Sequence, residues 1–92
     1  MLLMREVSKK ITGGKLVRIQ YDEKEGIITA FRLLGDFFLY PESALPVLEQ
    51  SLLEKPILNV SEILEQQLEA LDAQFIGVSA KDIQDILEED LS

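Results

Sequence analysis

The side chains that could do chemistry in this 92-residue chain are carboxylates, amines, guanidinium groups and hydroxyls, because the chain has no histidine and no cysteine. The usual general base, the commonest transition-metal ligand and the thiol nucleophile are therefore missing. Carboxylates recur at spacings typical of helix surfaces, as in Glu62, Glu65 and Glu69 and in Glu88 and Glu89. A Mg²⁺ or acid–base site needs carboxylates that converge in a cleft. We therefore expect no catalytic, cofactor-binding or metal-binding residue in the chain itself.

The paired glycines Gly13 and Gly14 are the next candidates, because glycine-rich loops can bind phosphate. They precede a predicted strand rather than a helix, so they lack the helix N-terminus that such a loop uses. Neither Gly-x-x-x-x-Gly-Lys-Ser/Thr nor Gly-x-Gly-x-x-Gly occurs in the sequence. A tight hairpin turn is the simpler interpretation.

Arginine and aromatic residues remain as candidates for binding a partner. Arg18, Arg32, Leu34, Phe38 and Tyr40 share one parity along the predicted strands. Arginine and aromatic side chains beside apolar ones are the composition of a binding surface. Helices that cover both faces of the sheet would instead make these residues ordinary packing, and the sequence leaves both alternatives open.

Asp36 is a further candidate contact, because it lies between Gly35 and Phe37 at the end of a predicted strand. Its carboxylate could serve a local turn or cap a nearby backbone N–H. A contact to a partner is the alternative.

Composition predicts one folded domain over residues 1–92, with 47% hydrophobic and 28% charged residues. The net charge of −8 is unevenly distributed along the chain. Residues 1–40 hold seven Lys/Arg and five Asp/Glu, whereas residues 41–92 hold two and twelve. An acidic second half argues against nucleic-acid binding. The apolar start, residues 1–4, is too short for a signal peptide or a membrane span, so we expect a cytoplasmic protein without membrane association.

The first 40 residues predict a three-stranded antiparallel meander over residues 3–40. Weak alternation from Leu3 to Ile11 indicates the first strand, and apolar Val17, Ile19 and Tyr21 indicate one buried face of the second. The polar stretch 22–26 predicts a hairpin loop, and the third strand is expected from Ile27 to Tyr40.

Odd positions of this third strand form a continuous apolar face from Ile27 to Leu39. Adjacent strand residues point to opposite faces. Phe37 and Phe38 therefore cannot both enter one core unless Gly35 marks a bulge. We assign Phe37 to the core, where its truncation to alanine would cost about 3 to 5 kcal/mol, and Phe38 to the other face.

Three helices are expected after the sheet, over residues 43–54, 60–72 and 79–91, which gives an α+β fold with the helices packed on the sheet. Ser43 is the predicted N-cap of the first helix and places Pro46 in its first turn, where a missing N–H costs little. Asn59 and Glu62 predict a capping box for the second helix. Residues 75–78 predict a short apolar link, and Ser79 caps the third helix.

Residues 14–53 resemble the C-terminal accessory domain of lipoate–protein ligases, which in some organisms is a separate small subunit. Gly35-Asp36-Phe37-Phe38 at a strand end, followed by a Leu-Glu helix, is the specific part of the resemblance, and Pro46 departs from the family's unbroken helix. The residues that carry the resemblance are Gly14-Lys15-Leu16-Val17, Ile28, Gly35-Asp36-Phe37-Phe38-Leu39-Tyr40-Pro41-Glu42, Leu45, Leu48-Glu49 and Leu52.

The resemblance implies an accessory, non-catalytic subunit. In that family the catalytic subunit binds ATP with Mg²⁺ and lipoate, and the small domain is needed for forming lipoyl-AMP. The implied partners are this catalytic subunit and, indirectly, lipoyl domains of 2-oxoacid dehydrogenase complexes or the glycine cleavage H protein. Arg18, Arg32, Leu34, Asp36, Phe38 and Tyr40 are the candidate interface.

Two other functions stay open on the residues alone. The chain could be an interaction module unrelated to lipoate, binding through the same mixed face of the sheet. A small independent enzyme that uses carboxylates is disfavoured by the missing histidine, cysteine and phosphate loops.

Overall fold

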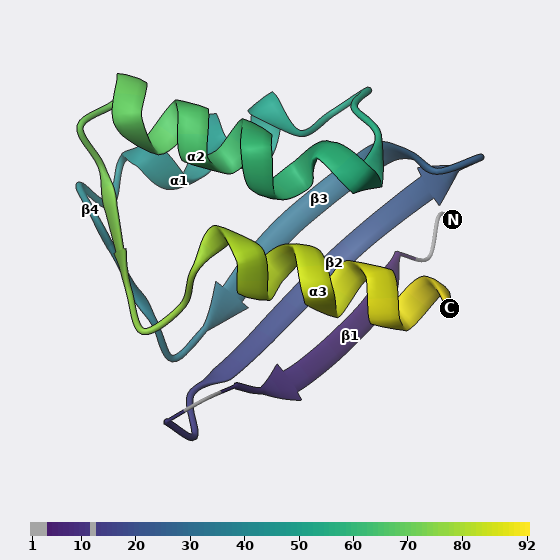
Figure 1. The fold of residues 1–92 in the computed structure, drawn as a ribbon, viewed down its shortest axis with the longest axis horizontal. Coiled ribbons are helices and arrows are strands. Elements are labelled where there is room, and N and C mark those ends of the chain that lie inside the picture. The colour runs from purple at the N-terminus through teal and green to yellow at the C-terminus, as the bar shows by residue number, and fades with distance from the viewer. Residues whose placement is uncertain (1–3, 12) are drawn as a thin grey trace.

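Alternating apolar residues build the predicted sheet. The computed structural model describes residues 4–11 and 13–92, so Leu3 lies outside the described residues. The antiparallel sheet has the order β1-β2-β3 (Figure 1). The apolar positions predicted for its second strand are fully buried, which confirms their parity. The strands are β1 (Arg5–Lys10), β2 (Leu16–Lys24) and β3 (Ile27–Gly35).

Both hairpins turn at glycines. Gly13 and Gly14 have φ angles of +91° and +77°, so the predicted tight turn is confirmed. The second turn consists of Glu25 and Gly26, with φ angles of +54° and +81°, which is the left-handed pair that suits a two-residue hairpin. The predicted loop over residues 22–26 was too long, because polar residues continue β2 as far as Lys24.

The third strand differs from the prediction in two ways. Its register shifts where Glu23 pairs with Ile28 while Asp22 pairs with Ala30, so one extra residue forms a bulge at Thr29 and not at Gly35. The bulge turns Ile28 into the core and leaves Ile27 37% exposed. The continuous odd-numbered apolar face was therefore wrong at its start. It is correct from Phe31 onward, where Phe31 and Leu33 are buried.

The strand also ends at Gly35 instead of Tyr40. Residues beyond it form a separate strand, β4 (Phe38–Tyr40), which pairs antiparallel with β5 (Gln74–Ile76). The stretch predicted as an apolar link over residues 75–78 is therefore partly a strand. Two segments more than thirty residues apart in the sequence thus build a second, two-stranded sheet.

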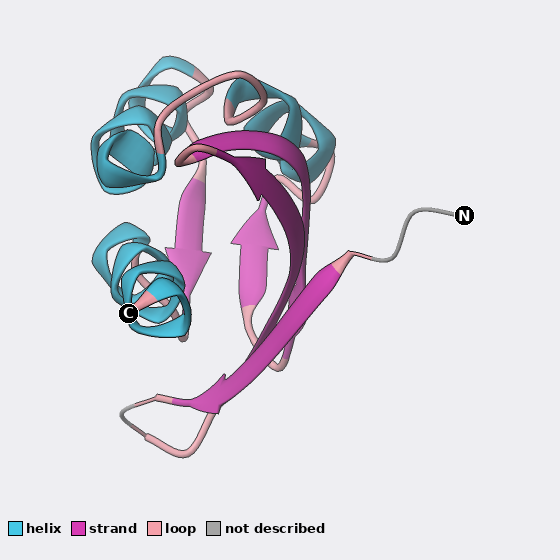
Figure 2. Cartoon of the chain, turned by 90° about the vertical axis from the view of Figure 1, so that its right-hand side faces the viewer, coloured by secondary structure: helices cyan, strands magenta, loops and turns pink. Residues whose placement is uncertain are grey.

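All three helices pack on one side of the three-stranded sheet (Figure 2). The predicted α+β class and the order of sheet and helices are confirmed. The first two helices end earlier than predicted, and Val47 in the first helix is 43% exposed. The helical elements are α1 (Ala44–Ser51), a 3₁₀ turn η1 (Ile57–Asn59), α2 (Val60–Ala70) and α3 (Ala80–Leu91).

A side-chain N-cap from a neighbouring residue forms in only one of the three described helices, α3. The Ser79 hydroxyl accepts from the Asp82 backbone N–H at 3.1 Å, and the Asp82 carboxylate accepts from the Ser79 N–H at 2.9 Å. Ser43 and Asn59 occupy the N-cap positions of α1 and α2, but neither side chain makes a capping hydrogen bond. The predicted capping box at Asn59 was therefore wrong. Pro46 lies in the first turn of α1, as expected.

A buried glutamine from α3 replaces the missing cap of α2. The Gln84 side chain is 7% exposed. Its Oε1 accepts from the Ser61 backbone N–H at 2.8 Å, and its Nε2 donates to the Ile57 carbonyl at 2.7 Å. Gln84 thus satisfies backbone groups of η1 and α2 while it sits between apolar residues.

Candidate partner interface

The outer face of the three-stranded sheet carries the predicted arginines. Arg18 pairs in register with Leu34, and Gln20 pairs with Arg32, so these side chains share the face opposite the helices. Arg18 and Arg32 are exposed, and Leu34 is 37% exposed. Since no helix covers this face in the described part of the chain (Figure 2), the alternative of ordinary semi-buried packing is wrong.

The arginines differ in their surroundings. The Arg18 Nε lies 3.7 Å from Glu6 Oε1, which also accepts a hydrogen bond from Gln20 Nε2 at 3.1 Å. Arg32 has no carboxylate within ion-pair distance among residues 4–11 and 13–92. Arg32, like Lys10 on the same face, is thus free to meet an acidic group of another protein.

The small sheet carries the exposed aromatic residues. Phe38 pairs with Ile76 and Tyr40 with Gln74, so the four side chains lie on one face of β4 and β5. Phe38 is 59% exposed, Tyr40 58% and Ile76 46%. Three large apolar side chains in one exposed cluster are typical of a surface that binds another protein.

The inward face of the small sheet holds it to the core. Leu39 is buried, and Phe75 packs edge-on against Phe37 with ring centroids 5.8 Å apart. Phe37 is half-buried rather than fully buried. The two phenylalanines of the Gly35–Pro41 stretch therefore point as predicted, Phe37 inward and Phe38 outward.

Gly35 makes the change of direction between the two sheets possible. Its φ is +145°, and a Cβ at this position would lie 2.3 Å from the Leu16 carbonyl oxygen. The next residue, Asp36, donates its backbone N–H to that same oxygen at 2.8 Å. The Asp36 side chain is exposed and makes no hydrogen bond to the described residues, so the local cap considered for this carboxylate is not formed.

Residues 4–11 and 13–92 contain no group of three or more acidic side chains placed to hold a metal ion. Burial, followed by a hydrogen bond from its hydroxyl to Asp90, raises the pKa of Tyr21 far above its ordinary value of 10.0. The neutral phenol donates to Asp90 Oδ2 at 2.5 Å. This pair joins the sheet to α3.

Sequence reasoning missed Ile76 as a surface residue. The alternation of Gln74, Phe75 and Ile76 before Gly77 is the signal that could have indicated a strand. Three residues are too few to distinguish an alternating strand from a short apolar link.

A solved structure of a bi-partite lipoate protein ligase and its E2 lipoyl domain from Thermoplasma acidophilum contains a chain that is similar to this one. The two chains are 25% identical, with a TM-score of 0.77, and the match covers 95% of this chain and 97% of that chain. No protein-family model and no curated protein matches the sequence. None of the described helices is long and apolar enough to cross a membrane.

Proposed function

We propose that this chain is the accessory, non-catalytic subunit of a lipoate–protein ligase. It acts with a separate catalytic subunit in the ATP-dependent activation of lipoate to lipoyl-AMP, which precedes transfer to lysines of lipoyl domains. The observation that carries the proposal is the likeness, over nearly the full length of both chains, to a chain from a bi-partite lipoate ligase system. The resemblance of residues 35–42 to the family's accessory domain supports the same assignment.

The exposed surface favours a ligase subunit over a lipoyl acceptor domain, the other component of that solved structure. Phe38, Tyr40 and Ile76 form an apolar cluster, and Phe38 lines one hollow together with Leu34. An apolar patch of this kind suits a lasting contact with a partner, whereas an acceptor domain must leave the enzyme after each transfer.

The proposed role is to complete and close the active site of the catalytic subunit. This chain supplies no acid, base or metal ligand to the reaction. Contacts through Arg18, Arg32, Leu34, Asp36, Phe38 and Tyr40 would order loops of the catalytic subunit around lipoate, ATP and Mg²⁺. Water exclusion and alignment then favour attack of the lipoate carboxylate on the α-phosphate of ATP, with pyrophosphate as the leaving group.

Lipoate-dependent exchange between ATP and pyrophosphate tests this role. We expect exchange when the catalytic subunit and this chain are combined, and little with either alone. Transfer from preformed lipoyl-AMP to a lipoyl domain should depend less on this chain. Equal exchange with and without the chain would overturn the proposal. Lipoyl label attached to a lysine of this chain would identify it as an acceptor domain instead.

A further inference from the structure

The outer edge of β3 has backbone groups that no strand pairs. β3 pairs with β2 on one side and with no other strand on the opposite side, within the described part of the chain. The Leu33 backbone N–H points to this free side and donates to Glu49 Oε2 at 2.9 Å. Because amide direction alternates along an antiparallel strand, the N–H groups of Phe31 and Gly35 point the same way. Neither bonds to a described residue outside the sheet.

The same edge already accepts backbone pairing near its start. The Ile28 N–H donates to the Lys55 carbonyl at 2.9 Å, and the Glu54 N–H donates to the Ile28 carbonyl at 2.7 Å. The segment after α1 thus covers the first residues of β3 by backbone hydrogen bonds. The edge from Ala30 to Gly35 is left for another segment.

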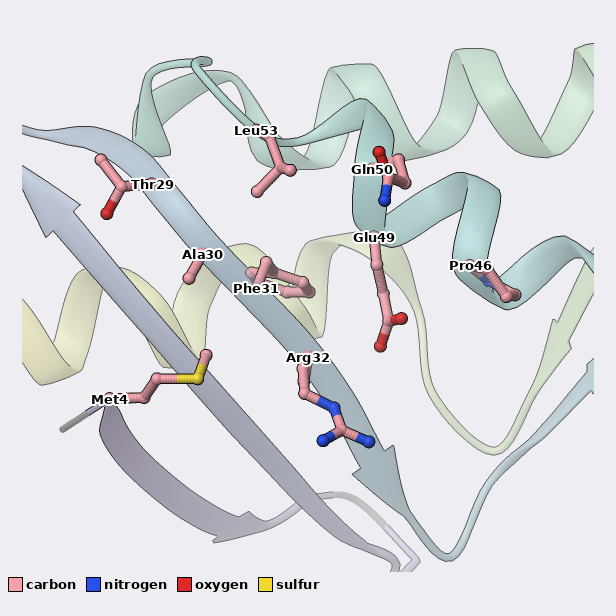
Figure 3. Close-up of a pocket in the computed structure, with 9 residues that line it drawn as sticks. All are labelled: Met4, Thr29, Ala30, Phe31, Arg32, Pro46, Glu49, Gln50 and Leu53. Carbon is pink, nitrogen blue, oxygen red and sulfur yellow. The ribbon is translucent and has the colours of Figure 1, made fainter. Parts of the chain in front are cut away.

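A groove runs along this free edge, between β3 and α1. One hollow of about 340 Å³ lies beside the middle of β3, where Arg32 reaches in from the strand and Glu49 and Gln50 reach in from α1 (Figure 3). A second hollow of about 540 Å³ continues toward β4. Pro46 borders both hollows. The second hollow is lined by apolar side chains that include Leu34, Phe37, Phe38 and Leu45.

The charges of the groove indicate what could occupy it. Arg5 and Arg18 each have an acidic partner, whereas Arg32 has none among the described residues. Glu49 lines the same hollow as Arg32, but its carboxylate accepts the Leu33 N–H. The Arg32 guanidinium is therefore left to meet a carboxylate of an incoming segment. The apolar hollow at the other end favours a large apolar side chain on the same segment.

We infer that an extended segment of the catalytic ligase subunit binds along β3 as an added strand. Its backbone pairs with the free N–H groups of Phe31 and Gly35, on either side of Leu33, whose N–H stays bound to Glu49. A carboxylate of the segment meets Arg32, and an apolar side chain fills the hollow bordered by Leu45 and Phe38. Strand addition of this kind uses main-chain hydrogen bonds for affinity and alternate side chains for specificity. The inference rests on the proposed function for the identity of the partner.

A second copy of this chain is the competing occupant, since two β3 edges could pair with each other. Such pairing would bring Glu42 and Glu49 of both copies into one groove. Each copy also carries a net charge of −8. The like net charges of the two copies oppose the pairing, so a different protein fits better.

Two substitutions with matched controls test the groove. Gln50→Trp fills the first hollow from an exposed position of α1, and Gln66→Trp places the same side chain on exposed α2. Arg32→Glu reverses the unpaired charge, and Lys81→Glu makes the same change on α3. Titration calorimetry against the catalytic subunit measures the dissociation constant. Far-UV circular dichroism and thermal unfolding verify that each variant is folded.

We expect Gln50→Trp and Arg32→Glu each to weaken binding about tenfold or more, a change of about 1.4 kcal/mol. The two controls should bind as the wild type does. Amide hydrogen exchange followed by NMR should show that the Phe31 and Gly35 N–H groups become protected in the complex.

The possible outcomes distinguish a failure of strand addition in the groove from a failure of the proposed function. If the wild-type chain stimulates lipoate activation while both groove variants bind normally and Phe31 and Gly35 stay unprotected, strand addition is wrong and the proposed function stands. If the wild-type chain neither binds the catalytic subunit nor stimulates activation, the proposed function fails, and the assignment of the groove fails with it. Protection of the same amides in a concentration-dependent dimer would assign the groove to a second copy.

Discussion

At the scale of single residues, Gly35 decides how the sheet region ends. A side chain there would collide with the Leu16 carbonyl oxygen, and the φ of +145° is one that residues with a Cβ rarely adopt. The chain can therefore leave β3, cross close to β2 and enter β4. The motif Gly35-Asp36-Phe37-Phe38 has its glycine because the backbone approaches another strand at that point.

Gly35→Ala should lower the free energy of unfolding by at least about 2 kcal/mol, because it adds both a steric clash and an unfavourable backbone conformation. Gly26→Ala is the matched control. Gly26 also has a positive φ, +81°, but a Cβ there meets nothing within 4 Å, so we expect a loss of about 1 kcal/mol. Urea unfolding of both variants measures the difference. Equal losses would show that the contact with Leu16 is unimportant.

The adjacent phenylalanines should respond differently to truncation. Phe37 is half-buried against Phe75, so Phe37→Ala should cost about 2 kcal/mol, less than the value expected for a fully buried ring. Phe38 is 59% exposed, and Phe38→Ala should change stability by less than about 0.5 kcal/mol. Urea unfolding measures stability, and calorimetry measures partner binding, which Phe38→Ala should weaken. A reversed order of stabilities would contradict the assignment of the two faces.

At the scale of elements, Gln84 couples three helical segments. It extends from α3 and bonds to backbone groups of Ser61 in α2 and Ile57 in η1. A buried amide with both ends satisfied fixes how α3 lies against the start of α2. The capping signal at Asn59, which is local in sequence, makes no such bond.

Gln84→Ala should therefore destabilise the fold by about 2 to 3 kcal/mol, because it leaves the Ser61 N–H without a partner and removes one of two hydrogen bonds to the Ile57 carbonyl, which also accepts the Val60 N–H. Asn59→Ala should cost less than about 0.5 kcal/mol. Thermal or urea unfolding of the two variants compares them directly. A larger loss for Asn59→Ala than for Gln84→Ala would mean that the Asn59 side chain caps α2 in solution and that the Gln84 contact contributes less.

At the scale of the whole molecule, the two ends of the chain are held together by the Tyr21–Asp90 pair and its neighbours. The Asp90 carboxylate also lies 3.4 Å from Arg5 Nε in the first strand, and the Arg5 guanidinium lies over the Tyr21 ring, 5.7 Å from its centroid. Lys9 pairs with Glu89 close by. The last helix is thus joined to β1 and β2 by polar contacts as well as by its apolar stripe.

Stability should fall in alkaline solution because of Tyr21. Its pKa is raised by burial and by Asp90 above the ordinary value of 10.0, so the folded state keeps a proton that the unfolded state loses. The contribution is fully present below pH 10 and decreases above it by about 1.4 kcal/mol per pH unit, until the folded-state pKa is reached.

The comparison with Tyr21→Phe isolates this effect. Phenylalanine keeps the ring but cannot ionise, and the lysines titrate alike in both proteins. The stability of the wild type relative to Tyr21→Phe should therefore decrease as the pH rises above about 10. Urea unfolding between neutral pH and this range measures it. A difference that stays constant with pH would show that the Tyr21 pKa is not raised.

The sequence by itself determined the order of sheet and helices, the buried face of β2, the N-cap of α3 and the opposite directions of Phe37 and Phe38. Each of these depends on residues close together in the chain. Alternation fixes which side chains share a face of a strand, and Ser79 reaches Asp82 within one helical turn.

Only the tertiary structure decided the bulge at Thr29, the pairing of β4 with β5, the cap that Gln84 provides and the uncovered outer face of the sheet. These depend on segments far apart in sequence, and a short strand such as Gln74–Ile76 has too few residues to reveal its partner. The candidate interface likewise depends partly on local sequence and partly on tertiary packing. Parity predicted that Arg32 and Phe38 point away from the core. The packing of all three helices on one face of the three-stranded sheet left Arg32 exposed, because no helix of the described residues covers the other face. Phe38 is exposed on the separate sheet of β4 and β5.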